Sequence, residues 1–165
     1  MKVVTTILFM TLAILSSSCN DDEEIPASMA GANSFFAKID GVNYNPPSVT
    51  GFRYESINTI LLTGATGTNE EQIQFTIPKD IEPGTYTVLN DPLASTFIQA
   101  FYAPPTSQEA GDDGFANQGN MMITLHDTTS KTIEGNFSFT TDVAMNSGDS
   151  WTITEGSFKI TYSDL

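Results

Sequence analysis

The chain has 165 residues, and its six Lys or Arg against 20 Asp or Glu give a formal net charge of −14 at pH 7. That length suits one domain with a full core. The negative charge argues against binding to nucleic acid or to other anionic polymers, whose own charges would repel it. One His and one Cys are too few ligands for catalytic zinc, and a disulfide within the chain is impossible.

Residues 1–18 have the pattern of a secretory signal. Lys2 gives a positive start, Val3 to Leu15 is mostly apolar, and the small residues Ser16 to Ser18 follow. The apolar run is shorter than the roughly 20 residues that a membrane-spanning helix needs. We therefore expect residues 1–18 to be a signal peptide that is removed.

The lone Cys19 follows directly, in the stretch "LSSSC". This stretch resembles the lipobox of bacterial lipoproteins, in which the cysteine is lipidated and becomes the first residue after cleavage. The usual pattern has Leu three places before the cysteine. Here Ser16 has that place and Leu15 lies one place further back, as in relaxed versions from Bacteroidota. The resemblance implies lipidation of Cys19 and a membrane anchor, and two or more acyl chains make such an anchor stable.

Four acids come next: Asp21, Asp22, Glu23 and Glu24. They resemble the acidic stretch of surface-exported lipoproteins of Bacteroidota, which implies an outer-membrane protein that faces the exterior. A periplasmic orientation is the alternative, with the acids as a plain solvated linker. Like charges repel one another and an anionic lipid surface. We expect residues 19–33 to be a flexible tether and residues 34–165 to be a single domain.

From residue 34 onward, apolar residues alternate with polar ones, which predicts half-buried strands. Asp40-Gly41 predicts a two-residue hairpin, Glu155-Gly156 resembles another, and residues 103–119 form the longest predicted loop. The fold class we expect is all-β, an antiparallel β-sandwich of roughly nine or ten strands. We place strands near 34–39, 42–45, 49–54, 57–65, 71–77, 84–89, 95–102, 119–126, 132–142, 150–154 and 157–163.

Four pieces of the domain read "FFAKIDGVNY", "PGTYTV", "ITLHDTTSKTIEGNFSF" and "ITEGSFKITY". Together they resemble a family of uncharacterised Bacteroidota lipoproteins with an all-β domain. The resemblance implies a fold and a location. It implies no catalytic or binding residue.

Residues that could carry chemistry are few. His126 is followed directly by Asp127, so on a strand the two side chains point to opposite faces, and we expect His126 to face solvent and to have no catalytic role. "GDDG" from Gly111 to Gly114 could give oxygen ligands to calcium, but the spacing of an EF-hand is absent. We expect no metal and no cofactor.

Three tyrosines are candidates for a ligand face. Tyr44, Tyr54 and Tyr102 each lie where a predicted strand runs into a loop, and we expect them to be exposed. Trp151 alternates in phase with Ile153, which favours core packing.

"DTT" from Asp127 to Thr129 resembles the O-glycosylation signal of Bacteroidota secretory proteins, and Thr128 would be the acceptor. The alternative is turn chemistry, in which Asp127 bonds local backbone amides.

These patterns predict a lipid-anchored protein that acts as a non-catalytic interaction module and binds a glycan or a protein at the cell surface. Two alternatives remain open. One is a glycoside hydrolase with a pair of carboxylates, and the other is a structural subunit similar to the lipoprotein pilins of Bacteroidota. Nucleic acid is not an expected partner.

Overall fold

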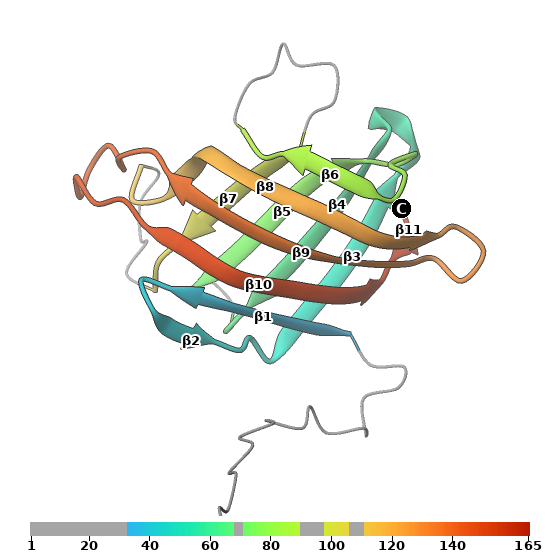
Figure 1. Ribbon diagram of the computed structural model, residues 1–165, viewed down its shortest axis with the longest axis horizontal. Helices are drawn as coiled ribbons and strands as arrows, with labels where there is room; N and C mark the ends of the chain where they lie inside the picture. The colour runs from blue at the N-terminus through green and yellow to red at the C-terminus, as the bar shows by residue number, and fades with distance from the viewer. Residues whose placement is uncertain (1–32, 68–70, 90–97, 106–110) are drawn as a thin grey trace, which may run out of the picture.

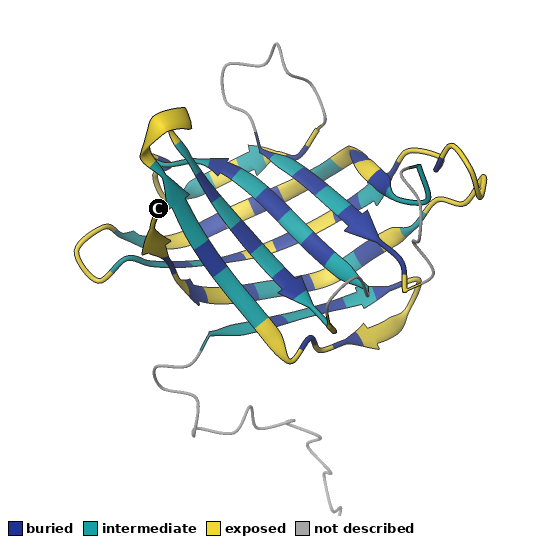
Figure 2. Cartoon of the chain, turned by 180° about the vertical axis from the view of Figure 1, so that it is seen from behind, coloured by how far each residue is buried: buried dark blue, intermediate teal, exposed yellow. Residues whose placement is uncertain are grey.

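The computed structural model describes residues 33–67, 71–89, 98–105 and 111–165, and within them it is built almost wholly of β-strands. One short 3₁₀ turn, η2 (Glu55–Ile57), interrupts them. The front layer in Figure 1 consists of β1 (Ser34–Ile39), β2 (Val42–Tyr44), β6 (Gly84–Thr87), β8 (Gly114–Asp127), β9 (Thr132–Thr141) and β10 (Thr152–Thr161). The back layer, seen in Figure 2, consists of β3 (Ser48–Tyr54), β4 (Thr59–Ala65), β5 (Gln72–Pro78), β7 (Gln99–Ala103) and β11 (Ser163–Asp164).

The strands form one curled sheet in the order β11-β3-β4-β5-β7-β8-β9-β10-β1-β2, and β6 pairs with the remaining edge of β8. Strand β8 joins the layers, because its first residues pair with β7 and its longer remainder pairs with β6 and β9. All of these strand pairs are antiparallel except β11 with β3. The predicted all-β sandwich is confirmed, and the strands of its two layers cross at an angle (Figures 1 and 2).

The core lies between the layers and is rich in aromatic rings. Phe75 of the back layer lies 4.7 Å from Phe137 of the front layer, measured between ring centres, and Phe35 lies 5.3 Å from Phe137. Buried and exposed residues alternate along the strands (Figure 2), as the period of two in the sequence requires. Each fully buried phenylalanine contributes about 1.5–3 kcal/mol.

The first predicted hairpin is confirmed. Strands β1 and β2 pair from Ile39 to Val42 across Asp40 and Gly41, whose φ angles are 48° and 83°. Two positive φ angles define a type I′ turn, which Asp-Gly favours because glycine has no Cβ to clash.

The predicted hairpin at Glu155-Gly156 is wrong. Strand β10 runs without a break through both residues and has a β-bulge there, with Glu155 at φ 52°. A Cβ on Gly156 would lie 2.4 Å from ring atoms of Phe137, so the glycine allows the buried ring to pack against the backbone. The Glu-Gly dipeptide, which favours a tight turn, forms a β-bulge here.

The start of β8 is also corrected. The strand begins at Gly114, five residues before the predicted residue 119, so the end of the predicted 103–119 loop is strand. Gly114 and Phe115 pair with Tyr102 and Phe101 of β7. Strand pairing overrides the Gly-, Asn- and Gln-rich composition of this segment.

The sandwich has two distinct ends. At the entry end, the chain enters β1 beside Lys159 of β10, and residues 55–57, 128–131 and 163–165 lie there too, on the right of Figure 1. At the loop end, on the left, lie the β1–β2 turn, residues 111–113 and the β9–β10 loop (142–151). No helix in the described ranges is long and apolar enough to cross a membrane.

Candidate functional site

The three tyrosines of the predicted ligand face do not share a surface. Tyr44 and Tyr102 are only 3% and 2% exposed, so their predicted exposure is wrong. Tyr54 lies at the end of β3, two residues after Phe52, on the outer face of the back layer. Tyr102 instead contacts Trp151 edge-on at 5.1 Å, and Trp151 packs against the core as predicted.

The two buried tyrosines are held by hydrogen bonds. The Tyr44 hydroxyl donates to Gly64 O at 2.6 Å, and the Tyr102 hydroxyl donates to Glu71 Oε1 at 2.7 Å. Burial raises the pKa of both phenols above the ordinary value, and the nearby Glu71 raises the pKa of each further. Both therefore stay neutral at physiological pH and act as buried donors.

His126 is half-buried, which corrects the predicted solvent-facing position. The pairing register of β8 with β9 shifts between Ile123 and Leu125, and this bulge turns His126 inward while Leu125 becomes exposed. Nδ1 lies 2.7 Å from Ile81 O and Nε2 lies 3.0 Å from the Tyr162 hydroxyl. A carbonyl can only accept, so neutral His126 carries its proton on Nδ1 and accepts at Nε2 from Tyr162. The contacts give His126 a structural role that ties β8 to Ile81 and Tyr162.

Charge compensation differs between the two ends. Each of the five Lys and Arg residues of the described chain has a carboxylate oxygen within 3.0 Å. Four of the five, Arg53, Lys79, Lys131 and Lys159, lie at the entry end, the first three with Glu55 and Asp164. The fifth, Lys38, lies on β1 two residues before the β1–β2 turn and is paired with Glu155. The described loops of the loop end themselves contain no Lys or Arg.

The loop end is therefore acidic. Its described acids are Asp40, Glu71, Asp112, Asp113, Asp142 and Asp149. Asp113 accepts from Gly111 N at 3.0 Å, which is turn chemistry. No group of three or more His, Cys, Asp or Glu side chains among the placed residues could hold a metal ion.

The β9–β10 loop is held in place by backbone hydrogen bonds. Asp142 N donates to Phe115 O at 2.8 Å, and the Asp142 carboxylate accepts from Phe115 N at 3.0 Å. Asn146 N donates to Gly111 O at 3.0 Å, and the side chain of Ala144 is buried. The loop thus has fixed contacts with β8 and with the segment before it.

Two apolar side chains of this fixed loop face solvent. Met145 is 93% exposed and Val143 is 64% exposed. Exposed apolar residues also occur at the entry end, where Ile57 and Leu165 lie among the paired lysines and Arg53. Val143 and Met145 were not among the site residues predicted from the sequence. Their signal was two large apolar residues in the stretch "TDVAMNSGDS", whose turn-forming composition offers them no core position.

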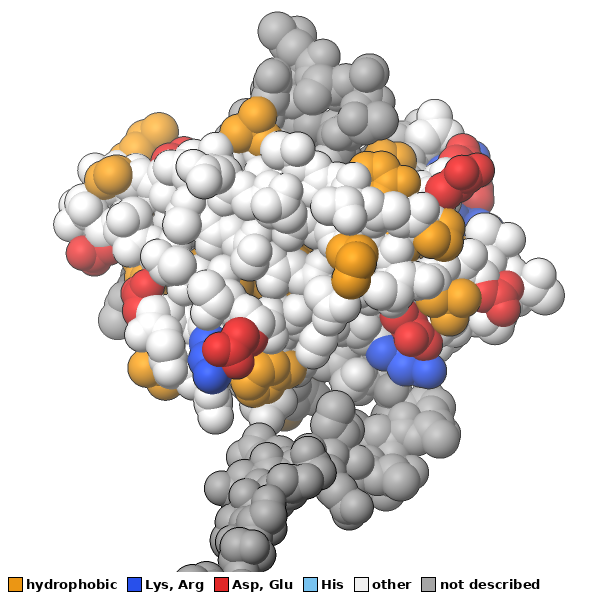
Figure 3. All heavy atoms as spheres, viewed as in Figure 1, with side chains coloured by type: hydrophobic (Ala, Val, Ile, Leu, Met, Phe, Trp, Pro, Cys, Tyr) orange, Lys and Arg blue, Asp and Glu red, His pale blue; other side chains and the backbone are white. Residues whose placement is uncertain are grey.

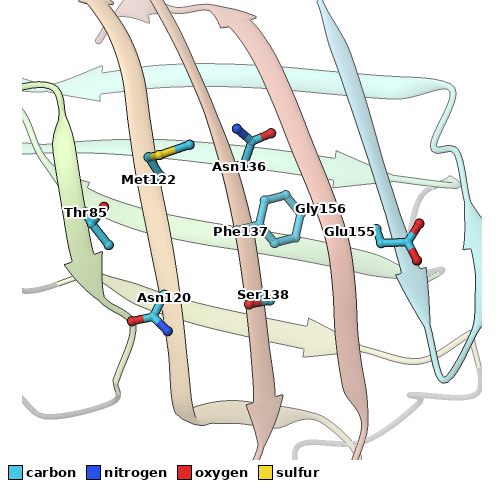
Figure 4. A pocket seen from close by; sticks show the side chains of 8 residues that line it. All are labelled: Thr85, Asn120, Met122, Asn136, Phe137, Ser138, Glu155 and Gly156. Carbon is cyan, nitrogen blue, oxygen red and sulfur yellow. The ribbon is translucent and has the colours of Figure 1, made fainter.

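A second surface feature is a shallow hollow of about 390 Å³ on the outer face of the front layer. It lies over β6, β8, β9 and β10 (Figure 4). The centre of this face is uncharged, and its acidic and basic side chains lie near the edges (Figure 3). Its lining contributes one carboxylate, that of Glu155, which is ion-paired with Lys38 at 2.8 Å. The carboxylate pair of a glycoside hydrolase is therefore not formed by the residues that line this hollow.

Thr128 is exposed in the β8–β9 turn, and the turn is organised by Asp127. The Asp127 carboxylate accepts from Thr129 N at 2.8 Å and from the Ser130 hydroxyl at 2.8 Å. The bond from Ser130 leads the causes that lower the pKa of Asp127. The predicted turn chemistry is confirmed, and glycosylation of Thr128 stays a prediction. Cys19 and the acids Asp21, Asp22, Glu23 and Glu24 lie outside the described residues.

Comparison with known proteins gives a family. A family model described as "Domain of unknown function (DUF6252)" matches residues 32–160, which span all the strands up to β10. Searches of curated proteins and of solved structures find no match. The chain therefore belongs to the family described as Domain of unknown function (DUF6252).

Proposed function

We propose that this chain is a lipid-anchored protein of the outer membrane that faces the exterior and acts as a non-catalytic interaction module. The lipobox-like stretch before Cys19 and the acidic residues 21–24 support the anchor and the outward orientation. The tether of residues 19–33 leads into β1 at the entry end. An anchored molecule then has its entry end toward the membrane and its loop end away from it.

The observation that carries the proposal is the position of Met145 and Val143. They are exposed on a loop with fixed backbone contacts, at the end of the sandwich opposite the chain entry (Figure 1). Loops held by a rigid scaffold are where binding residues concentrate. An unbranched, polarisable Met side chain adapts to the shape of a partner.

The charge around these residues indicates the kind of partner. Six acids surround the loop end without a lysine or an arginine in its described loops. Complementary charge steers association and suppresses wrong partners. The partner we propose is a protein whose surface combines an apolar pocket with basic residues around it.

The anchor is tested with labelled palmitate. The native chain should incorporate the label and Cys19→Ala should not, since the cysteine is the only attachment point. Equal labelling of both would refute lipidation of Cys19. Protease added to intact cells should remove the native chain, and replacement of Asp21, Asp22, Glu23 and Glu24 by Ala should protect it.

The contact surface is tested by cross-linking on intact cells. A photoreactive residue at position 145 should give one discrete adduct with another protein, and the same residue at position 128 of the entry end should not. The adduct should weaken with added salt and with Asp149→Asn, because screening and neutralisation remove charge attraction. Equal adducts at both positions, or an adduct of two copies of this chain, would contradict the proposal, and the second result would favour a structural subunit.

Glycosylation of Thr128 accompanies the export proposal. Its side chain is exposed in a turn of the entry end. The intact mass of the native chain should exceed that of Thr128→Ala by a glycan, beyond the mass difference of the two side chains. Thr129→Ala is the matched control and should keep the glycan, and native and Thr128→Ala masses that differ only by the substitution would reject the site.

A further inference from the structure

The hollow on the front layer is framed by short, uncharged polar side chains. Asn120 and Ser138 are cross-strand partners on β8 and β9, and Met122 and Asn136 are the next such pair on the same face. Thr85 of β6 pairs with Met122 and extends this row. Figure 4 shows these side chains and Glu155 arranged around the hollow, on four neighbouring strands.

The hydrogen-bonding groups of four of these residues are uncommitted. Within the described part of the chain, the side chains of Thr85, Asn120, Asn136 and Ser138 form no hydrogen bond with another protein group. Thr140, two residues beyond Ser138 on β9, differs, because its hydroxyl donates to Asn117 Oδ1 at 2.9 Å. The amides and hydroxyls at the hollow are therefore free to donate to and accept from a ligand.

The charge at the hollow selects a neutral ligand. No Lys or Arg is among the lining residues, and the single acid, Glu155, has its charge compensated by Lys38. The bulge that puts Glu155 at φ 52° holds this residue at the margin, between β10 and β1. An anionic ligand finds no cation here, and a cationic one finds no unpaired carboxylate.

The chemistry also distinguishes a glycan from a protein partner. Protein interfaces depend on large anchors, chiefly Trp, Tyr and Arg, and the exposed side chains of this hollow include none of these. Its only large exposed apolar side chain is Met122, at 44%. The hydroxyls of a neutral sugar offer a donor and an acceptor at each position, which matches the amide and hydroxyl groups of the lining.

We propose that this hollow binds a neutral glycan through Asn120, Asn136, Ser138 and Thr85, with the Met122 side chain against one sugar face. The site is separate from the loop end, and it adds a ligand class to the interaction module proposed above. It rests on that function only in requiring a chain that meets external glycans. The two surfaces can be tested independently because no residue belongs to both.

The test is calorimetric titration of the full chain, purified in mild detergent, with neutral hexasaccharides of glucose, mannose and xylose. At least one should bind, and the variant Asn120→Ala/Asn136→Ala should bind it at least about tenfold more weakly. Ser138→Phe, which fills the hollow, should abolish binding. The matched control is Thr63→Ala/Gln74→Ala, a cross-strand pair on the outer face of the back layer, which should keep native affinity.

Three outcomes would overturn the proposal. The first is that none of the three probes binds at millimolar concentration. The second is that the front-layer and back-layer variants lose glycan affinity equally. The third is that the front-layer variants lose the cross-linked protein adduct and still bind the glycan. Met145→Ser separates the two proposals, because it should weaken the protein adduct and leave glycan binding unchanged. Each variant should unfold thermally at the same temperature as the native chain, which checks that its fold is intact.

Discussion

At the residue scale, the buried tyrosines show what a hydroxyl does inside this sandwich. Tyr44 and Tyr102 come from β2 and β7, and both have contacts with Glu71 or its carbonyl group. The aromatic rings fill the loop end of the core, and the hydroxyls satisfy Gly64 O and the Glu71 carboxylate. A buried hydroxyl that donates a hydrogen bond costs little folding free energy, whereas removing the hydroxyl leaves a buried acceptor without its partner.

Tyr102→Phe tests this pairing through its pH dependence. A phenol whose pKa is raised on folding contributes stability that is full below its unfolded pKa of about 10 and is lost as pH rises toward the folded value. The variant should lose about 1 kcal/mol at pH 7 with its hydrogen bond. It should also show a smaller fall in the free energy of unfolding between about pH 9 and 11 than the native chain.

The measurement is denaturant unfolding at both ends of that pH range. Tyr54→Phe is the control, since it leaves the contacts of Tyr44, Glu71 and Tyr102 intact. An alkaline loss of the same size in Tyr102→Phe and in the native chain would show that the phenol is not responsible.

The period of two in the sequence predicted most strands, because one buried face requires alternation. The expected exposure of Tyr44 and Tyr102 rested instead on their place at the ends of predicted strands. It was wrong because their burial depends on segments distant in the chain: Gly64 lies 20 residues from Tyr44, and Glu71 lies 31 from Tyr102. The period of two failed for His126, because one extra residue in β8 inverts the alternation after Ile123. The alternation along a strand shows which residues share a face, but it does not show where the pairing register shifts by one residue.

At the element scale, β10 is the strand that best shows how a bulge is built. Its register with β9 shifts between Ile153 and Gly156, and its register with β1 shifts nearby, between Phe36 and Lys38. The irregularity brings Gly156 onto the ring of Phe137 and places Glu155 within reach of Lys38. Local sequence favours a turn at this dipeptide, and packing against the core makes it a continuous strand.

Gly156→Ala tests the close packing. The new methyl group would lie 2.4 Å from Phe137 ring atoms, which cannot move far in a core of five phenylalanines. Overpacking of this kind costs roughly 1–3 kcal/mol, which denaturant unfolding would measure. Ser157→Ala, the next residue along β10, should change stability by less than about 0.5 kcal/mol. An unchanged Gly156→Ala stability would mean that the ring is free to shift away.

At the scale of the whole molecule, charge divides the sandwich. The entry end has a linked set of ion pairs, in which Asp164 bridges Lys131 and Arg53. The hydrogen bond from Lys131, together with the charges of both cations, lowers the pKa of Asp164. The described loops of the opposite end contain acids and no Lys or Arg. The family model and the fold carry no function by themselves, so the two ends and the hollow are where a function is to be found.

Asp164→Asn tests the entry-end pairs through acid titration. A carboxyl whose pKa is lowered on folding contributes stability that is present above its ordinary value of about 4 and is lost as pH falls through the folded value. The native chain should therefore be more stable than the variant at pH 7, by a modest margin because the pairs are exposed. Thermal unfolding from pH 7 to about pH 2 should show that margin shrink, and a constant margin would exclude the linkage.

The central claim is that a lipid-anchored sandwich presents its loop end to the exterior, and one labelling experiment tests it most directly. If Cys19 carries lipid, Met145→Cys has a single free thiol, on a side chain that is 93% exposed. A membrane-impermeant maleimide should label this variant on intact cells as fully as after lysis, and the native chain should stay unlabelled. Labelling of Met145→Cys only after the outer membrane is opened, or labelling of Cys19 in the native chain, would contradict the account.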